Sequence, residues 1–337
     1  MTWWQALILG IVEGLTEYLP VSSTGHLLVV QKLLGIGTQS HQAWQAANAY
    51  AICIQAGAIV AVLGLYYQRV RQGVIGLVGR VGVGPGDEAG WRLTCNLVIA
   101  FLPAAVVGLI FNDAIEAYLF GAWPVVAAWF VGGVAIVAVA FWKKRKAGDE
   151  HLGKLIDAMD WRMALAIGVI QCLAMWPGTS RSLVTIVGGM IVGLSLVSAV
   201  EFSFLLGVIT LCAATVYKAL IDTMPLEGGG EQMMLLAMAD EYGWWRMLLG
   251  SFAAWLSAVI AIKWMVAYLK KHGMEGFGYY RVALACVVAA LILAGTLDAT
   301  TPAEVSPDPA AQPAAVTGSA VTIPAVTASA ITDQAAP

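Results

Sequence analysis

The chain has 337 residues, of which 60% are hydrophobic and only 12% are charged, and its mean hydropathy is +0.79. This composition excludes an ordinary soluble domain and predicts an all-α polytopic membrane protein whose surroundings are the lipid bilayer. The formal net charge of −3, without a basic tract, argues against a nucleic acid partner.

Six stretches can cross a bilayer, because a spanning helix needs about 20 predominantly apolar residues. In chain order they are 46–67, 93–112, 122–142, 198–218, 246–268 and 278–297. Two further apolar pairs are short and broken by proline and hydroxyl clusters, namely 3–18 with 24–36 and 162–176 with 183–196. The final segment, 298–337, has no aromatic or basic residue and many Ala, Pro and Thr residues, so we predict a disordered tail.

The charged connections predict the topology. Basic residues collect in the connections 69–92, 143–162 and 270–271, which should face the cytoplasm, and acidic residues in 113–116 and 222–241, which should face outward. The chain then divides into two halves of opposite orientation, about 1–142 and 160–297, and each broken pair must enter and leave on one side. We therefore predict six transmembrane helices plus two re-entrant helix pairs, arranged as inverted-topology repeats in one membrane domain over 1–297.

The first broken pair carries two acids within apolar sequence. Glu13 and Glu17 lie four residues apart, hence on one face of a helix, and ionisable groups at membrane depth default to a functional interpretation. Their like charges predict a bound divalent cation, Mg²⁺ or Ca²⁺, or a proton retained by one of them. A polar run follows, consisting of Ser22, Ser23, Thr24, Gly25 and His26. An imidazole so close to acids and hydroxyls is suited to acid/base catalysis.

The second broken pair carries an anion-binding pattern. Ser180, Arg181 and Ser182 follow a Pro-Gly and precede an apolar helix, where a guanidinium, hydroxyls and backbone N–H groups together suit phosphate oxygens. The alternatives for Arg181 are an interfacial side chain or a structural ion pair with Glu13 or Glu17. The two pairs share one frame, in which a glycine stands three residues before Glu13 and before Gln171. They therefore look like diverged copies, and their polar turns should meet in one pocket.

At these residues the chain closely resembles the bacterial undecaprenyl-diphosphate phosphatase family, also called bacitracin-resistance protein, over about residues 5–297. The motif Glu-Gly-Leu-Thr-Glu-Tyr-Leu-Pro-Val-Ser-Ser-Thr-Gly-His stands at Glu13 to His26, and Gln-Cys-Leu-Ala-Met-Trp-Pro-Gly-Thr-Ser-Arg-Ser at Gln171 to Ser182. Carried over, the functional positions of the family are Glu13, Glu17, Ser22, Ser23, His26, Ser180, Arg181 and Thr185. Leu183 and Ile209 depart from the usual family residues beside the motif.

The resemblance implies hydrolysis of undecaprenyl diphosphate to the monophosphate carrier of cell-wall synthesis, in the inner membrane with an outward-facing site. Arg181, Ser180, Ser182 and Thr185, with backbone donors around Thr24 and Gly25, would hold the diphosphate. Glu17 and Glu13 would bind the cation or handle protons, and His26 would be the acid/base. Ser23 could attack directly or orient a water, and both remain open. A transporter or flippase of the same lipids is the alternative function, and a homodimer also stays open.

Overall fold

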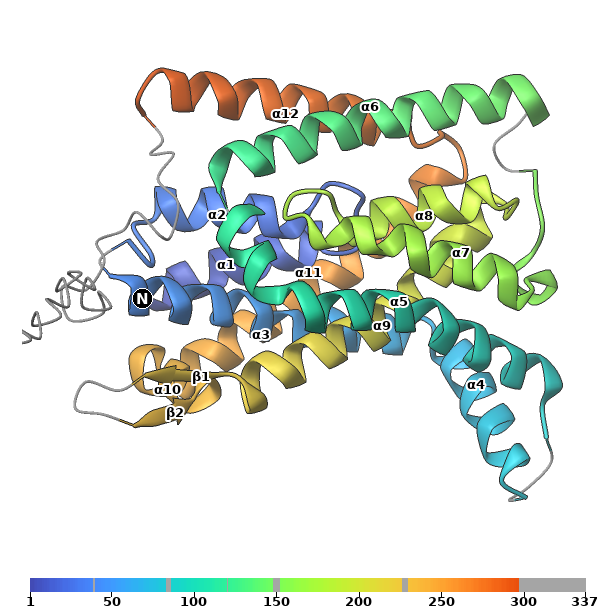
Figure 1. Cartoon of the computed structure of the whole chain (residues 1–337), viewed down its shortest axis with the longest axis horizontal. Helices are drawn as coiled ribbons and strands as arrows, with labels where there is room; N and C mark the ends of the chain where they lie inside the picture. The colour runs from blue at the N-terminus through green and yellow to red at the C-terminus, as the bar shows by residue number, and fades with distance from the viewer. Residues whose placement is uncertain (39, 83–85, 120, 148–151, 226–229, 297–337) are drawn as a thin grey trace, which may run out of the picture. The chain divides into compact units, whose positions relative to one another are not determined.

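The computed structural model describes residues 1–38, 40–82, 86–119, 121–147, 152–225 and 230–296, and Figure 1 shows its helices. The described elements are α1 (Trp3–Thr16), α2 (Ser23–Leu33), α3 (His41–Leu65), α4 (Tyr67–Arg80), α5 (Glu88–Leu119), α6 (Ala122–Ala147), η1 (Ile156–Ala158), α7 (Trp161–Gln171), η2 (Cys172–Met175), α8 (Arg181–Ile191), α9 (Leu196–Val216), η3 (Tyr217–Ile221), β1 (Thr223–Pro225), β2 (Glu231–Met233), α10 (Met234–Tyr242), α11 (Trp244–Leu269) and α12 (Glu275–Leu293). The predicted tail at 298–337 lies outside the described residues.

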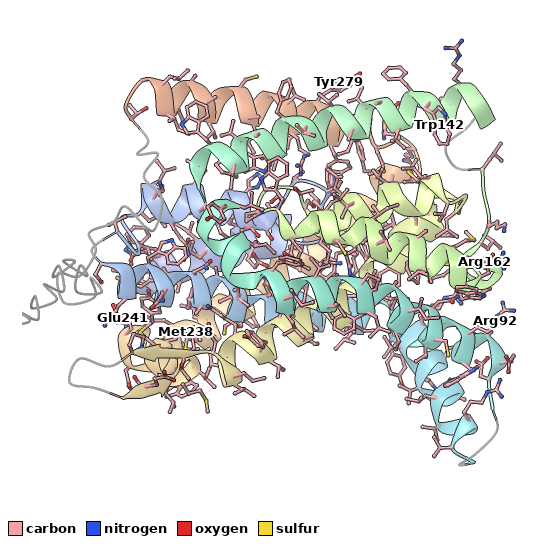
Figure 2. All side chains as sticks on the ribbon, viewed as in Figure 1. Arg92, Trp142, Arg162, Met238, Glu241 and Tyr279 are labelled. Carbon is pink, nitrogen blue, oxygen red and sulfur yellow. The ribbon has the colours of Figure 1, made fainter. Side chains whose placement is uncertain are left out.

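The six predicted spans are confirmed. Within the described part of the chain, six helices are long and apolar enough to cross a membrane: Gln42–Leu65, Glu88–Phe111, Ala122–Trp142, Leu196–Ile221, Trp244–Leu269 and Glu275–Leu293. The two broken pairs form the shorter helices α1 with α2 and α7 with α8. Entry and exit of each pair on one membrane face stays a prediction. Figure 2 places Arg92 and Arg162 at one end of the helices and Met238 and Glu241 at the other, as the charge pattern requires.

Helix α4 and the strands β1 and β2 add structure that the hydrophobic spans did not predict. In the loop 222–245 the apolar run 233–238 suggests a surface helix, and α10 forms there. The basic connection after the first span forms α4, whose apolar residues Val74, Leu77 and Val78 are spaced three and four residues apart and so lie on one face, as in an amphipathic helix. Before α10, the short strands β1 and β2 pair antiparallel, with Thr223 opposite Met233. An amphipathic helix and short strands are not long apolar runs, so the pattern of hydrophobic spans does not contain them.

The first helix of each broken pair begins at a side-chain cap. Thr2 and Gln5 form a capping box at the start of α1. At the start of α7, Asp160 accepts hydrogen bonds from the N–H groups of Met163 and Arg162, and these bonds hold the pKa of Asp160 below its usual value. The polar residues before both apolar runs therefore determine where the two helices start.

Most helix contacts of the first half have an equivalent contact in the second half. Helix α1 packs on α11 of the other half, and its counterpart α7 packs on α5. Within the halves, α2 contacts α3 and α8 contacts α9, while α3 with α9 and α6 with α12 join equivalent helices. Figure 1 shows α6 and α12 side by side. The first helix of each broken pair is thus held by the opposite half, which brings the two polar turns together.

A glycine at the same place in both copies permits these close contacts. A Cβ on Gly10 would lie 2.2 Å from the carbonyl oxygen of Gly250 on α11, and one on Gly168 would lie 2.5 Å from that of Ala100 on α5. Each glycine stands three residues before the polar residue of its copy, Glu13 or Gln171. The shared frame in the sequence therefore reflects a shared helix-packing requirement, since only glycine lets two backbones approach so closely.

Candidate active site

Each broken pair turns at a serine with unusual backbone geometry. We call residues 17–23 the first tip and residues 177–182 the second tip. Among the described residues, the non-glycine residues with positive φ are Ser22 (φ 73°) and Ser180 (φ 75°), at equivalent places in the two copies. Their hydroxyls cap α2 and α8, accepting from the N–H groups of Gly25 and Leu183. Such backbone costs about 1–3 kcal/mol and clusters at functional sites.

The residue after each strained serine opens a helix and carries the chemistry of its copy. In the first tip this residue is Ser23, and in the second it is Arg181. Both side chains meet Glu17: Ser23 Oγ donates to Oε2 at 2.5 Å, and Arg181 Nη2 donates to Oε1 at 3.3 Å. The ion pair is largely buried, with 12% of the Arg181 side chain and 6% of the Glu17 side chain exposed. An acid, a hydroxyl and a guanidinium from two half-chains therefore form one cluster, which we call the tip cluster.

Arg181 is held in place by the helix behind it. Its Nη1 donates to the carbonyl oxygen of Ser203 on α9 at 3.0 Å, and its guanidinium lies 5.5 Å from the ring centroid of Tyr18. Gly207 leaves the space for this side chain, because a Cβ there would lie 2.3 Å from Nη1. Ser203, Tyr18 and Gly207 therefore hold the guanidinium in position. Its Nε has no hydrogen-bond partner among the described residues.

The hydroxyls that the sequence singled out in the second copy support this arrangement. Ser182 Oγ donates to the carbonyl oxygen of Leu19 in the first tip at 2.9 Å, and Ser180 Oγ lies 3.0 Å from Ser182 Oγ. Thr185 is fully buried, donates to the carbonyl oxygen of Arg181 at 2.8 Å and lies 2.6 Å from Ser203 Oγ. In this structure Ser182 links the tips and Thr185 stabilises the turn that carries Arg181; their contact with substrate stays a prediction.

Glu13 is the least satisfied polar residue of the cluster. It is fully buried one turn before Glu17, and both its carboxylate oxygens lack a hydrogen-bond partner among the described residues. An unpartnered buried carboxylate is costly and calls for a proton or a cation. Among the described residues no group of three or more His, Cys, Asp or Glu side chains could hold a metal ion. Two carboxylates nevertheless fit Mg²⁺, which is usually bound by one or two carboxylates together with substrate phosphates and water.

His26 contacts groups other than Ser23 in this structure. Its Nδ1 lies 2.6 Å from the carbonyl oxygen of Ser22, so the neutral ring carries its proton on Nδ1. Its Nε2 then accepts from the hydroxyl of Tyr280 on α12 at 2.8 Å. The ring also stacks on Tyr280 and meets Trp129 of α6 edge-on, with centroids 5.9 Å and 5.4 Å away. The hydroxyl beside the imidazole is therefore that of Tyr280.

The remaining predicted residues lie on the first turn of α2. Thr24 is half-buried, and Gly25 is buried against Trp129, whose Cζ2 would lie 2.4 Å from a Cβ on that glycine. Sequence reasoning missed Tyr280, Trp129 and Ser203, because neither motif contains them. A signal for α12 was present all the same, since Arg281 is a charged residue inside a predicted span and adjoins Tyr280.

Comparison with known proteins gives consistent matches along most of the chain. Residues 6–287 match the family model described as "Bacitracin resistance protein BacA". A protein of Sorangium cellulosum named undecaprenyl-diphosphatase is 42% identical over 294 residues, which cover 86% of each chain. One of Pseudomonas fluorescens with the same name is 40% identical over 296 residues, or 88% of this chain and 96% of the relative. Undecaprenyl-diphosphatase 2 of Rhodospirillum rubrum is 39% identical over 87% of this chain and 96% of its own.

Proposed function

Because the chain belongs to the Bacitracin resistance protein BacA family, we infer that it is an integral membrane undecaprenyl-diphosphatase. It hydrolyses undecaprenyl diphosphate to undecaprenyl phosphate and inorganic phosphate, which recycles the lipid carrier of peptidoglycan synthesis and gives bacitracin resistance. The single observation that supports this best is Glu17, which accepts from the Ser23 hydroxyl and from Arg181 at once. A transporter of the same lipid would use the guanidinium but has no need for a carboxylate placed on a serine hydroxyl.

Phosphate release from a long-chain polyprenyl diphosphate by the purified protein in detergent tests this function. Release that depends on the tip cluster supports it. A correctly folded protein that releases no phosphate would instead favour the transport of polyprenyl phosphate lipids. Position in the bacterial inner membrane, an active site that opens toward the outer side and a homodimer are further proposals. The first two rest on the family, and the charged connections support only the orientation of the helices.

The diphosphate would bind between the two tips. The first turns of α2 and α8 start at the tips, so their N–H groups and helix dipoles favour an anion there. Arg181 adds a fixed positive charge, and its pairing with Glu17 would be shared with the phosphate oxygens. We propose that this guanidinium stabilises the charge that develops on the transferred phosphoryl group.

The attacking oxygen comes from Ser23 or from a water that Ser23 orients. In either case the Glu17 carboxylate is placed to accept the proton as the new P–O bond forms and the anhydride bond to undecaprenyl phosphate breaks. If Ser23 attacks, a second step with water releases the phosphate from the serine. Trapping a phosphorylated serine during turnover would distinguish the two routes, and its absence would favour direct attack by water.

We propose that Glu13 and Glu17 hold a divalent cation. When bound, such a cation would neutralise charge on both phosphates of the substrate. The prediction is that Mg²⁺ or Ca²⁺ stabilises the wild-type protein against thermal unfolding by roughly 1–3 kcal/mol at saturation. Glu13→Gln should remove this stabilisation, because it replaces a carboxylate ligand whose oxygens have no other partner among the described residues.

The measurement is a melting curve of the substrate-free protein with increasing cation. Glu201→Gln is the matched control, since Glu201 is also a partly buried carboxylate but is paired with Arg69 at 2.9 Å. An identical cation response in wild type and in Glu13→Gln would contradict the proposed ligand.

We propose that His26 is a general acid/base of the reaction. Tyr280→Phe should then lower kcat about fivefold to tenfold, because removing the hydroxyl removes one hydrogen bond to the imidazole and leaves the ring in place. KM should change little, since Tyr280 holds His26 and not the substrate. Tyr279→Phe is the control: the neighbouring tyrosine is 56% exposed and points away from the bundle in Figure 2. Kinetics of phosphate release decide the prediction, and equal effects of the two substitutions would refute it.

A further inference from the structure

Arg281 on α12 is a fully buried cation that the proposed reaction does not use. Its Nη1 donates to the carbonyl oxygen of Pro20 at 3.3 Å, and its Nη2 donates to those of Gly178 and Ala128, both at 2.9 Å. No carboxylate pairs with it among the described residues. Among the described residues its hydrogen bonds therefore go to backbone carbonyls alone, and its Nε has no partner.

Two of these carbonyls are equivalent in the two copies. Pro20 stands two residues before the strained Ser22 of the first tip, and Gly178 stands two residues before the strained Ser180 of the second. A single guanidinium thus binds the same backbone position of both tips. A planar group with several N–H donors in fixed directions can bridge two carbonyls in this way, and an ammonium cannot do so with the same geometry.

The neighbouring helix is shaped around this side chain. A Cβ on Gly132 of α6 would lie 2.5 Å from Arg281 Nη2, so the guanidinium occupies the space that this glycine leaves. The third carbonyl that it binds, that of Ala128, lies one turn earlier on α6. The packing of α6 on α12 therefore holds the guanidinium in place independently of its contacts with the two tips.

The other contacts between the tips involve groups that the substrate would engage. Among the described residues these contacts are the pair of Glu17 with Arg181, the hydrogen bond from Ser182 to the Leu19 carbonyl, and the approach of the Arg181 guanidinium to the Tyr18 ring. A bound diphosphate would compete for Arg181 and for the hydroxyls of the second tip. Among the described residues, the tip atoms that Arg281 hydrogen-bonds are main-chain oxygens, which an anionic diphosphate would not engage.

We propose that Arg281 is a positioning residue for the hydrolysis, which fixes the separation of the two tips so that Ser23 and Glu17 face Arg181. This inference rests on the proposed function. A displacement of about 1 Å in a reacting group can cost roughly 100-fold in rate. Loss of the bridge should therefore act on kcat and leave KM nearly unchanged, because the individual phosphate-binding groups remain present.

The experiment compares full-length wild type with Arg281→Met, Arg281→Lys and Gly132→Ala, with Gly64→Ala as control. Gly64 is also a helical glycine, but open space surrounds its Cβ position. Phosphate release gives kcat and KM, and hydrogen exchange of the substrate-free protein reports on the main chain of both tips. We expect Arg281→Met to lower kcat about 100-fold with KM within threefold, and to accelerate exchange in both tips at once. Gly132→Ala, which keeps the guanidinium but displaces it, should change both readouts in the same direction.

Arg281→Lys separates geometry from charge. If the bridge matters, lysine restores little of the lost turnover. Wild-type turnover in Arg281→Lys would overturn the proposal, as would faster exchange confined to α6 and α12 with both tips unchanged. If the Arg281 variants do not fold, Gly132→Ala carries the test, and wild-type kcat in that variant would likewise overturn it. Failure of the wild type to release phosphate would refute the proposed function, whereas the exchange measurement would still show whether Arg281 holds the tips.

Discussion

Replacement of Arg181 by alanine is expected to lower kcat/KM for phosphate release about 1000-fold, the loss typical of a charged group that stabilises a phosphoryl transition state. The guanidinium is the positive charge of the tip cluster, and contacts with Ser203, Tyr18 and Glu17 hold it in position. Arg181→Lys should recover only part of the activity, because one ammonium cannot contact Ser203, Glu17 and a phosphate with the same planar geometry.

Two companion substitutions test whether the loss comes from position as well as charge. Gly207→Ala keeps Arg181 but places a methyl group 2.3 Å from the present site of Nη1, so turnover should fall although every motif residue is intact. Arg162→Ala is the control, because this exposed arginine on α7 contacts the Trp161 ring and lies outside the tips. Equal losses in Arg162→Ala and Arg181→Ala would mean that the assay reports general damage to the fold.

Replacement of Glu17 by glutamine is expected to lower kcat by a factor of about 100 to 10,000, the range for loss of a general base. An amide oxygen can still accept a hydrogen bond, but the amide cannot take the proton and forms no ion pair with Arg181. Breaking a buried ion pair by itself would cost about 3–5 kcal/mol of stability. Here part of that cost is offset, because the neutral amide removes the repulsion with the buried carboxylate of Glu13.

The Glu17 prediction therefore has two readouts, kcat and the free energy of unfolding. Turnover should fall steeply while stability falls by less than about 3 kcal/mol. Glu201→Gln provides the comparison, since it removes a carboxylate that is 20% exposed and paired with Arg69 away from the tips. Its turnover should stay close to that of the wild type. A Glu17→Gln variant that turns over at the wild-type rate would remove Glu17 from the proposed mechanism.

The sequence alone determined the spans, because a bilayer requires long apolar helices and such runs are visible without knowledge of tertiary contacts. It also determined the frame shared by the two broken pairs. The glycines at 10 and 168 and the serines at 22 and 180 are local requirements, for close packing and for a turn, and each copy satisfies them within a few residues. The amphipathic α4 and the short strands did not follow from that argument, since they are not long apolar runs.

Only the tertiary structure decided which polar groups meet. Sequence left Arg181 with several partners, and the structure pairs it with Glu17 while leaving Glu13 unpaired among the described residues. Sequence placed His26 beside hydroxyls of its own segment, and the structure gives it the hydroxyl of Tyr280. The role of Arg281 follows only from its tertiary contacts, because it donates hydrogen bonds to the carbonyls of both Pro20 and Gly178. The physical reason is that these contacts join residues far apart in the chain, so the packing of α1 on α11, α7 on α5 and α6 on α12 sets them, and no local pattern records that packing.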